Sequence, residues 1–165
     1  MALSRRFARL ACLLLVSALL PLLAAPARAQ SQADIDKVVS LMHADNYDFR
    51  TTTSNSVWTI HFTGDHLKDI KVVIAVGGDP SMLVIFVTVS EKRTLPVTTD
   101  FMSSLLKKNH EFDRVKIGYD ADGDLFVRDD AMLRVTDAEE FHSIISQVEK
   151  SSDELYGDIQ SQLLN

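Results

Sequence analysis

The apolar residues that follow residue 30 recur at the spacing of one helical face. They lie three or four positions apart within SQADIDKVVSLMHADNY, at Ile35, Val38, Val39 and Met42. This period predicts an amphipathic helix, and Ser31 or Asp34 can serve as its N-cap.

The pattern then changes to that of strands. Four stretches rich in Val, Ile, Thr and aromatic residues, at 47–53, 56–64, 69–76 and 82–90, are separated by the turn-forming sequences SNS, GDHLK and GGDPS. Short stretches of this composition between turns are typical of strands that pair with their neighbours. We therefore expect four consecutive strands in an antiparallel meander.

A second helix and two more strands follow the meander. The helix is predicted over 97–112, with Thr98 or Thr99 as its N-cap. Period-two alternation returns at 114–120 and 124–130. Together with a final helix, the order is α-β-β-β-β-α-β-β-α, which predicts an α+β domain with helices packed on one face of an antiparallel sheet.

The final helix has a longer apolar stripe than a small domain needs. A capping box at Thr136 and Glu139 predicts its start, and apolar residues recur every three or four positions, apart from a gap at Ser152, at Phe141, Ile145, Val148, Leu155, Ile159 and Leu163. Because an average helix has about 11 to 12 residues, we expect Leu155, Ile159 and Leu163 to belong to a possible interaction surface. The alternative is a break near Ser151-Ser152 or at Gly157, after which the tail folds back or frays.

The first 29 residues have the composition of a secretory signal peptide. A basic head precedes an apolar run over 10–23, and the sequence ARA at 27–29 provides a cleavage site. We expect a mature protein that starts at Gln30 and is periplasmic or secreted, with an uncleaved anchor as the alternative. Residues 30–165 then form a single α+β domain.

Composition narrows the classes of function. The only cysteine, Cys12, lies in the predicted signal peptide, so the mature chain has no thiol for catalysis, redox chemistry or thiolate metal binding. Cleavage removes four of the 17 Lys and Arg residues and leaves 13 against 23 acidic residues, a net charge of −10. This acidity argues against nucleic acid and against a membrane surface as partners.

The acidic sequence YDADGDLFVRDD at 119–130 raises the question of a calcium site. With Gly123 at the sixth position of a helix–loop–helix calcium loop, three aspartates occupy ligand positions, but the first position falls on Gly118 and the last on Asp129. The flanking alternation favours a β-hairpin, in which Asp120 opens a type I turn and Gly123 takes the left-handed conformation. Weak cation binding at this loop is the alternative.

The other chemistry-bearing residues form no catalytic constellation. His61, Asp65 and His66 could be a fragment of a metal site, but they flank a turn and are interpreted as surface residues. GGDP at 77–80 lacks the Lys-Ser/Thr of a phosphate loop, and no GxSxG or HExxH sequence is present. We therefore expect no enzyme activity, no catalytic or metal-binding residue and no cofactor. Trp58 either packs within the domain or offers a surface to a ligand, and we include it in the possible interaction surface.

Most of the predicted mature domain resembles a known family. The sequence RTLPVTTDFMSSLLKKNHEFDRVKIGYDADGDLFVRDD, followed by a helix that ends near DELY, is similar to the YbjN-like family in its helix ending in Asn109, its Asp-Gly hairpin turn and its terminal amphipathic helix. That family is similar in fold to the class I chaperones of type III secretion. The resemblance implies a secretion-chaperone-like fold and a protein-binding, often dimeric domain without known chemistry. The predicted export signal distinguishes this chain from the secretion chaperones, which are cytoplasmic.

Two hypotheses for function follow. The first is an exported, non-catalytic protein-binding module, chaperone-like or regulatory, with a protein partner of unknown identity. The second, motivated by the acidic turns and Trp58, is a periplasmic protein that binds a small molecule or, weakly, a cation. The resemblance favours the first hypothesis and also a homodimer, formed through the last helix or through the edge of the hairpin over 114–130.

Overall fold

The domain has the order of helices and strands that the sequence predicts. The computed structural model describes residues 32–78, 80–95 and 98–163, and the predicted signal peptide lies outside them. The elements are α2 (Gln32–Ala44), β1 (Phe49–Thr51), β2 (Val57–Phe62), β3 (Ile70–Gly77), β4 (Met82–Ser90), the 3-10 turn η2 (Lys92–Thr94), α3 (Thr99–Glu111), β5 (Lys116–Tyr119), β6 (Leu125–Met132), the 3-10 turn η3 (Leu133–Val135) and α4 (Ala138–Leu163).

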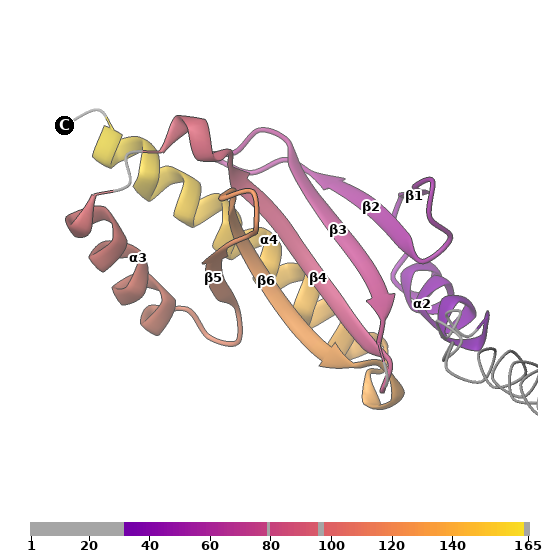
Figure 1. Ribbon diagram of the computed structural model, residues 1–165. Coiled ribbons are helices and arrows are strands. Elements are labelled where there is room, and N and C mark those ends of the chain that lie inside the picture. The colour runs from indigo at the N-terminus through magenta and orange to yellow at the C-terminus, as the bar shows by residue number, and fades with distance from the viewer. Residues whose placement is uncertain (1–31, 79, 96–97, 164–165) are drawn as a thin grey trace, which may run out of the picture.

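The six strands form one antiparallel sheet in the order β1-β2-β3-β4-β6-β5. The first four strands are the predicted meander, and the β5–β6 hairpin joins it with β6 beside β4. Helix α4 runs behind the sheet and contacts β3, β4 and β6, while α2 packs against α4 and β3 (Figure 1). The helices therefore cover one face of an antiparallel sheet, as predicted.

The core lies between this covered face and α4. Alternate residues of β2, β3, β4 and β6 point into it, and most are β-branched or leucine side chains that suit a pleated surface. Phe141, Ile144, Ile145 and Val148 of α4 meet them and are at most 1% exposed. Full burial of each such side chain contributes roughly 1.5 to 3 kcal/mol, so this interface dominates the stability of the domain.

Helix α4 is continuous, so the alternative of a break near Ser151-Ser152 or at Gly157 is wrong. Ser152 is fully buried, and its hydroxyl donates to the carbonyl of Val148 at 2.6 Å, which satisfies the polar group inside the helix. Ser152 therefore interrupts the apolar stripe as a small, buried and hydrogen-bonded residue. The helix continues past it.

The ends of the helices correct two of the predicted caps. Asp137 caps α4, because its Oδ1 accepts the N–H of Glu140 at 2.9 Å, whereas Thr136 ends the preceding turn η3 and its hydroxyl donates to the carbonyl of Met132. Asp34 lies within α2 and accepts a hydrogen bond from Ser81 instead of capping the helix, and the other candidate cap of this helix, Ser31, lies outside the described residues. Thr98 caps α3 as expected, through the N–H of Phe101.

The acidic loop between β5 and β6 is the predicted turn. Gly123 has a φ of 86°, and its N–H donates to the carbonyl of Asp120 at 3.1 Å. The N–H groups of Asp122 and Asp124 donate to Oδ1 of Asp120. The Asp120 carboxylate therefore fixes the backbone of the turn.

None of the helices within the described residues is long and apolar enough to cross a membrane.

Candidate protein-interaction surface

The face of the sheet opposite α4, called the open face below, carries no described helix or loop packed along it (Figure 1). Paired residues in an antiparallel sheet point to the same side, so the strand registers define this face. Its side chains are those of Arg50, Val57, Thr59, His61, Lys71, Val73, Ala75, Met82, Val84, Phe86, Thr88, Lys116, Phe126, Arg128, Asp130 and Met132.

One ladder of paired residues crosses all six strands on the open face. From β1 to β5 it contains Arg50, Thr59, Val73, Phe86, Arg128 and Lys116. The middle of the ladder is apolar and both ends are basic. The neighbouring ladder adds Val57, Ala75 and Val84, so the apolar area extends along β2, β3 and β4.

The apolar residues of the open face are separate from the core. Val73, Val84 and Phe86 are each partly exposed, and none of them packs against the core cluster. An antiparallel sheet with one solvated face normally alternates apolar residues inside with polar residues outside. A contiguous apolar area in the middle of such a face is typical of a surface that binds another molecule.

Every Lys and Arg of the described strands lies on the open face. Arg50 and Lys71 are exposed and form no ion pair with a described residue. Lys116 and Arg128 both contact Asp130, at 2.8 and 2.6 Å, and Asp130 is the only acidic strand residue on this face. Burial alone would raise the pKa of Asp130, but these two cations outweigh it and lower the pKa, so the carboxylate stays charged.

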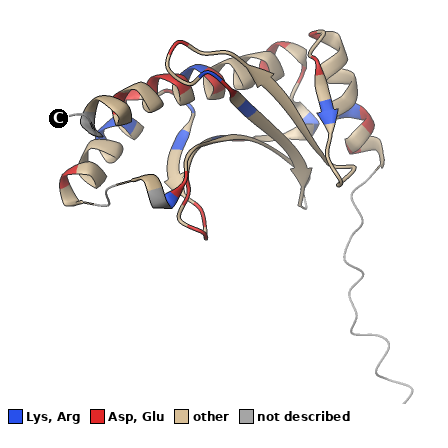
Figure 2. Cartoon of the chain, turned by 90° about the horizontal axis from the view of Figure 1, so that it is seen from above, with Lys and Arg blue, Asp and Glu red and all other residues tan. Residues whose placement is uncertain are grey.

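The helical side of the domain has the opposite charge. Helix α4 contains six acidic residues and one lysine. Figure 2 shows acidic residues along the helices and basic residues on the strands, and it also shows the acidic β5–β6 turn projecting beyond the sheet on the open side. The strand residues of the open face therefore carry more basic than acidic charge, while Asp69, Glu91 and Asp124 of the adjoining loops line a pocket with Lys71 at one end of the face.

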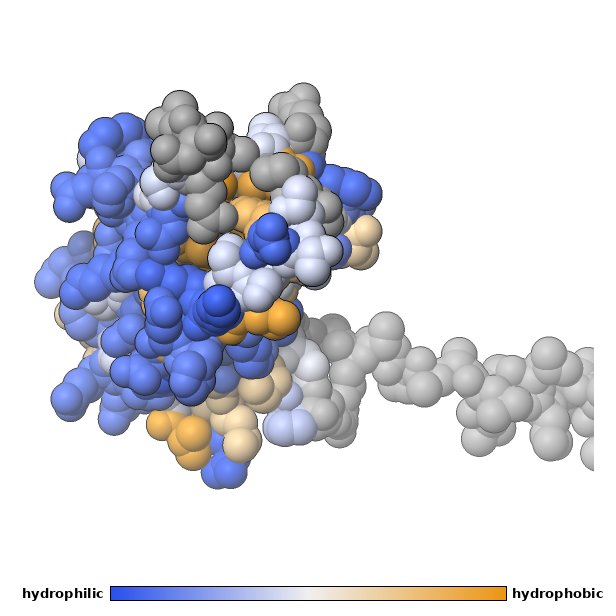
Figure 3. Space-filling view, turned by 90° about the vertical axis from the view of Figure 1, so that its left-hand side faces the viewer, coloured by the Kyte–Doolittle hydropathy of each residue, from blue (hydrophilic) through white to orange (hydrophobic). Residues whose placement is uncertain are grey.

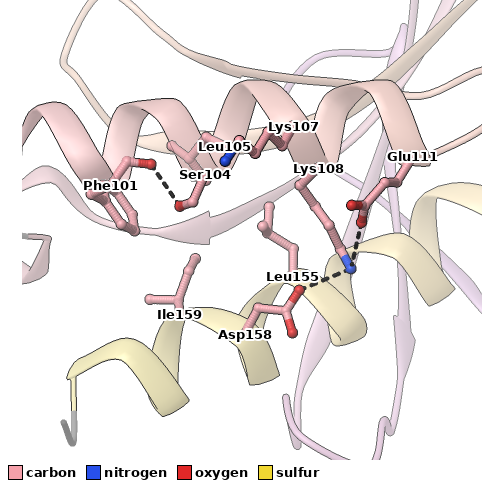
Figure 4. A pocket seen from close by; sticks show the side chains of 9 residues that line it. All are labelled: Phe101, Ser104, Leu105, Lys107, Lys108, Glu111, Leu155, Asp158 and Ile159. Carbon is pink, nitrogen blue, oxygen red and sulfur yellow. Dashed lines mark hydrogen bonds and ion pairs between the residues drawn. The ribbon is translucent and has the colours of Figure 1, made fainter.

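The predicted interaction residues of α4 lie elsewhere, in the contact between α3 and α4. Leu155 is 1% and Ile159 2% exposed, and they line a cavity of about 200 Å³ together with Phe101 and Leu105 of α3 (Figure 4). The expectation that Leu155 and Ile159 form an exposed surface is corrected, because α3 covers the end of the stripe. The side chain of Leu163 lies outside the described residues.

Lys108 holds α3 against α4. Its Nζ is 2.5 Å from Glu154, 2.9 Å from Asp158 and 3.5 Å from Glu111 (Figure 4). Burial alone would lower the pKa of Lys108, but the hydrogen bonds to the acidic residues of α4 outweigh it and raise the pKa. Figure 3 shows this end of the molecule as mostly hydrophilic, with hydrophobic residues visible in its middle. The contact is therefore internal to the domain and polar at its rim.

Trp58, the fourth predicted interaction residue, is 1% exposed and belongs to the core on the covered face of β2. Of the two roles expected for Trp58, packing within the domain is therefore confirmed, and its inclusion in an exposed interaction surface is corrected. Its strand neighbours Val57 and Thr59 point to the open face, which places the partly exposed positions of β2 one residue away from Trp58.

The histidines and carboxylates around the β2–β3 turn do not converge on one point. His61 contacts Asp69 at 2.7 Å, whereas the ring of His66 lies against Gly157. Among the described residues, no group of three or more His, Cys, Asp or Glu side chains could hold a metal ion.

Asp153 of α4 fastens the β2–β3 turn to the helical side. Its two carboxylate oxygens accept the N–H groups of Asp65, His66 and Leu67, at 2.7 to 3.1 Å. Burial alone would raise the pKa of Asp153, but these three donors outweigh it and lower the pKa. A Cβ at Gly64 would lie 2.1 Å from the Asp153 carboxylate, so glycine permits this close approach.

A buried acid lies on the covered face of β6. Asp129 is 6% exposed, and Arg114 contacts it at 3.3 Å while bonding Glu140 with two guanidinium nitrogens. Burial raises the pKa of Asp129, although the charge of Arg114 opposes this shift. Arg114 thereby connects the loop after α3 to both β6 and α4, which is a structural role.

Comparison of the sequence with known proteins gives no match to a family model and none to a curated protein. The structure, in contrast, is similar to solved structures. A chain of the ExsC–ExsE complex is 10% identical, with 76% of this chain and 92% of that chain covered and a TM-score of 0.54.

Two further structures are similar over comparable lengths. A chain of the heterodimeric ExoU–SpcU complex from the type III secretion system of Pseudomonas aeruginosa is 16% identical, with 74% and 97% covered and a TM-score of 0.53. An uncharacterized protein from Methanothermobacter thermautotrophicus is also 16% identical, with 78% and 98% covered and a TM-score of 0.56. At these identities the likeness shows the fold alone, an α+β fold similar to that of type III secretion chaperones.

Proposed function

We propose that this domain is an exported, non-catalytic protein-binding module, chaperone-like or regulatory, of the YbjN-like type, and that it holds its partner on the open face. The observation that carries the proposal is the apolar area formed by Val73, Val84 and Phe86, which no described element covers. Burial of apolar surface is the main favourable term in most protein association.

The similar structures support a protein as the partner. The ExsC–ExsE and ExoU–SpcU structures are both complexes between two proteins. The fold that these chains share with this protein is therefore one that occurs in protein complexes. The resemblance of the sequence around Asn109 and the Asp-Gly turn to the YbjN-like family supports the same class of function.

Capture from the cell envelope tests this proposal. Phe86→Glu places a charge in the middle of the open face, so we expect the variant to lose proteins that the wild type captures. Leu106→Glu is the matched control, since Leu106 is 70% exposed on α3 and lies off the open face. Equal capture by the wild type and by the folded Phe86→Glu variant would reject the open face as the binding surface.

Export is part of the proposal and rests on the sequence of residues 1–29. The intact mass of the protein from the envelope fraction should correspond to a start at Gln30. A mass that retains Arg5 would show that the segment acts as an anchor instead.

A homodimer is also proposed, from the family resemblance. Because Leu155 and Ile159 are buried within one chain, the remaining predicted route is the β5–β6 hairpin edge. The side chain of Asn109 already occupies part of that edge by accepting the N–H of Ile117 at 2.9 Å. Light scattering at tens of micromolar tests the dimer, and a strictly monomeric mass would reject it.

The alternative function, binding of a small molecule or cation, has a direct test. Calorimetric titration with calcium and zinc should give no heat of binding if the acidic loop is only a turn. Binding tighter than micromolar, together with no captured protein, would replace the proposed function by this alternative.

A further inference from the structure

We propose that the segment bound on the open face is an amphipathic helix whose apolar stripe is flanked on both sides by acidic residues. This inference rests on the proposed function, since it names the partner chemistry for the same surface. It follows from the dimensions of the face, from the position of its charges and from the poor fit of the other occupants.

The dimensions of the open face suit a helix lying along the strands. The basic residues Arg50 and Arg128 lie on β1 and β6, four strand spacings apart in the sheet order. At about 4.8 Å per spacing, their backbones are about 19 Å apart. A helix with its side chains is about 10 to 12 Å wide, so it fits between the two basic positions and leaves room for flanking side chains to reach them.

The length of the face sets the length of the segment. β4 has nine residues and spans about 30 Å at roughly 3.3 Å per residue. A helix of about 20 residues has the same length. Its apolar stripe would contact Val73, Val84 and Phe86, as helices pack on sheets elsewhere in this domain.

The charges of the face select acidic flanks. Arg50 has no acidic partner among the described residues, so a carboxylate brought to it gains an ion pair without displacing one. Lys71 forms no ion pair with a described residue either, but it lines a pocket with Asp69, Glu91 and Asp124, so the selection rests mainly on Arg50 at one flank and on Lys116 and Arg128 at the other. Asp130 neutralises only part of the charge of Lys116 and Arg128. A segment with basic flanks would instead place like charges together as water is excluded.

The same charges disfavour two other occupants. A second copy of this chain, packed through the same face, would bring the basic positions of both copies together. The N-terminal segment of this chain carries only basic charges, at Arg5, Arg6, Arg9 and Arg28, and would be repelled in the same way.

An anionic membrane surface fits less well than an acidic helix. The turn with Asp120, Asp122 and Asp124 projects on the open side of the sheet (Figure 2), so it would approach a flat bilayer together with the basic residues. The net charge of −10 after cleavage adds to the repulsion. A helix between β1 and β6 is narrower than a bilayer, and it approaches this turn at the end of β4, where Thr88 and Asp124 line one pocket.

Two matched synthetic peptides test the inference. Each has 20 residues with leucines at i, i+3, i+4 and i+7, and one carries Glu on both flanks of this stripe where the other carries Lys. Fluorescence anisotropy is measured with the protein expressed from its full gene and purified as the cell processes it. We expect the Glu peptide to bind at least tenfold more tightly than the Lys peptide, and its affinity to fall as salt is added.

Charge reversal provides the matched variants. The double variant Arg50→Glu with Lys71→Glu should lose at least tenfold in affinity for the Glu peptide. The control Lys107→Glu with Lys150→Glu makes the same change in net charge at exposed positions of α3 and α4, and it should leave the affinity unchanged. The melting temperatures of both variants establish that they are folded.

Three outcomes overturn the inference. They are equal or tighter binding of the Lys peptide, equal loss of affinity in both double variants, and flotation with phosphatidylglycerol vesicles in the absence of binding to the Glu peptide. If both peptides bind equally and Phe86→Glu abolishes both, the charge selection fails while the proposed function stands. If Phe86→Glu leaves envelope capture unchanged, the proposed function itself fails.

Discussion

The two faces of the sheet share a period-two apolar pattern, yet only one is closed by a helix. On the covered face, residues such as Ile74 and Ile85 are fully buried beneath α4. On the open face, their strand neighbours Val73, Val84 and Phe86 remain partly exposed, and basic residues lie at the two ends of the ladder that contains Val73 and Phe86. The covered face therefore accounts for most of the stability of the domain, whereas no described element packs over the apolar residues of the open face.

Truncation of a large side chain on each face gives the largest expected contrast. Phe141→Ala empties a fully buried site against the covered face and should cost about 3 to 5 kcal/mol of unfolding free energy. Phe86→Ala on the open face should cost less than about 1.5 kcal/mol, because its ring is only partly buried. Urea denaturation measures both, and comparable losses would contradict the distinction between the faces.

The Asp153 contact sharpens the comparison on the helical side. Asp153→Ala leaves three backbone N–H groups of the β2–β3 turn without their acceptor and should cost about 2 kcal/mol. Because the folded state lowers the pKa of Asp153, its contribution is present above the ordinary Asp pKa and is lost as the pH falls through the folded value. Thermal melts across the acid range measure this loss, and Glu139→Ala, at an exposed position of the same helix, should leave the profile unchanged.

Asp129, the only acidic strand residue on the covered face, should show the opposite pH dependence. Burial raises its folded pKa, so its contribution is present below the ordinary Asp pKa and is lost as the pH rises through the folded value. Asp129→Asn should therefore remove this part of the pH dependence and change stability at neutral pH by about 1 kcal/mol or less. Thermal melts of the wild type and of Asp129→Asn between acidic and neutral pH measure this difference. The same dependence of the melting temperature on pH in both proteins would contradict the raised pKa of Asp129.

The smallest effect is expected from the ion pairs of the open face. Lys116→Met removes one of the two cations at Asp130, and the side chain of Lys116 is largely exposed. Pairs of this kind contribute about 0 to 1 kcal/mol, so the unfolding free energy should change by no more than that. A larger loss would give the open face a role in stability.

The element order could be predicted from the sequence because alternation and turn chemistry are local. The pairing of β6 with β4 was not predicted, and the interaction surface expected from the sequence was placed on other residues than the open face that is now proposed. The sequence does contain a signal for that surface, since DIKVVIAV and MLVIFVTVS are nearly continuous apolar runs within an antiparallel meander. Such runs indicate strands that are apolar on both faces.

The errors on the last helix have a tertiary cause. The stripe at Leu155 and Ile159 exceeds what the sheet covers, and only the position of α3 shows that Phe101 and Leu105 complete its burial. The contact of Asp153 with the β2–β3 turn likewise joins residues 86 to 88 positions apart in the sequence. A local pattern contains no information on either contact.

The position of α4 after all six strands has a consequence for biosynthesis. All six strands leave the ribosome before the helix that closes their covered face, so the nascent sheet has two apolar faces and no native core. Phe141 to Val148 complete that core, and residues near Ile159 then close the site under α3. Native folding therefore waits for the synthesis of α4, and a chain truncated before α4 should behave as an aggregation-prone intermediate.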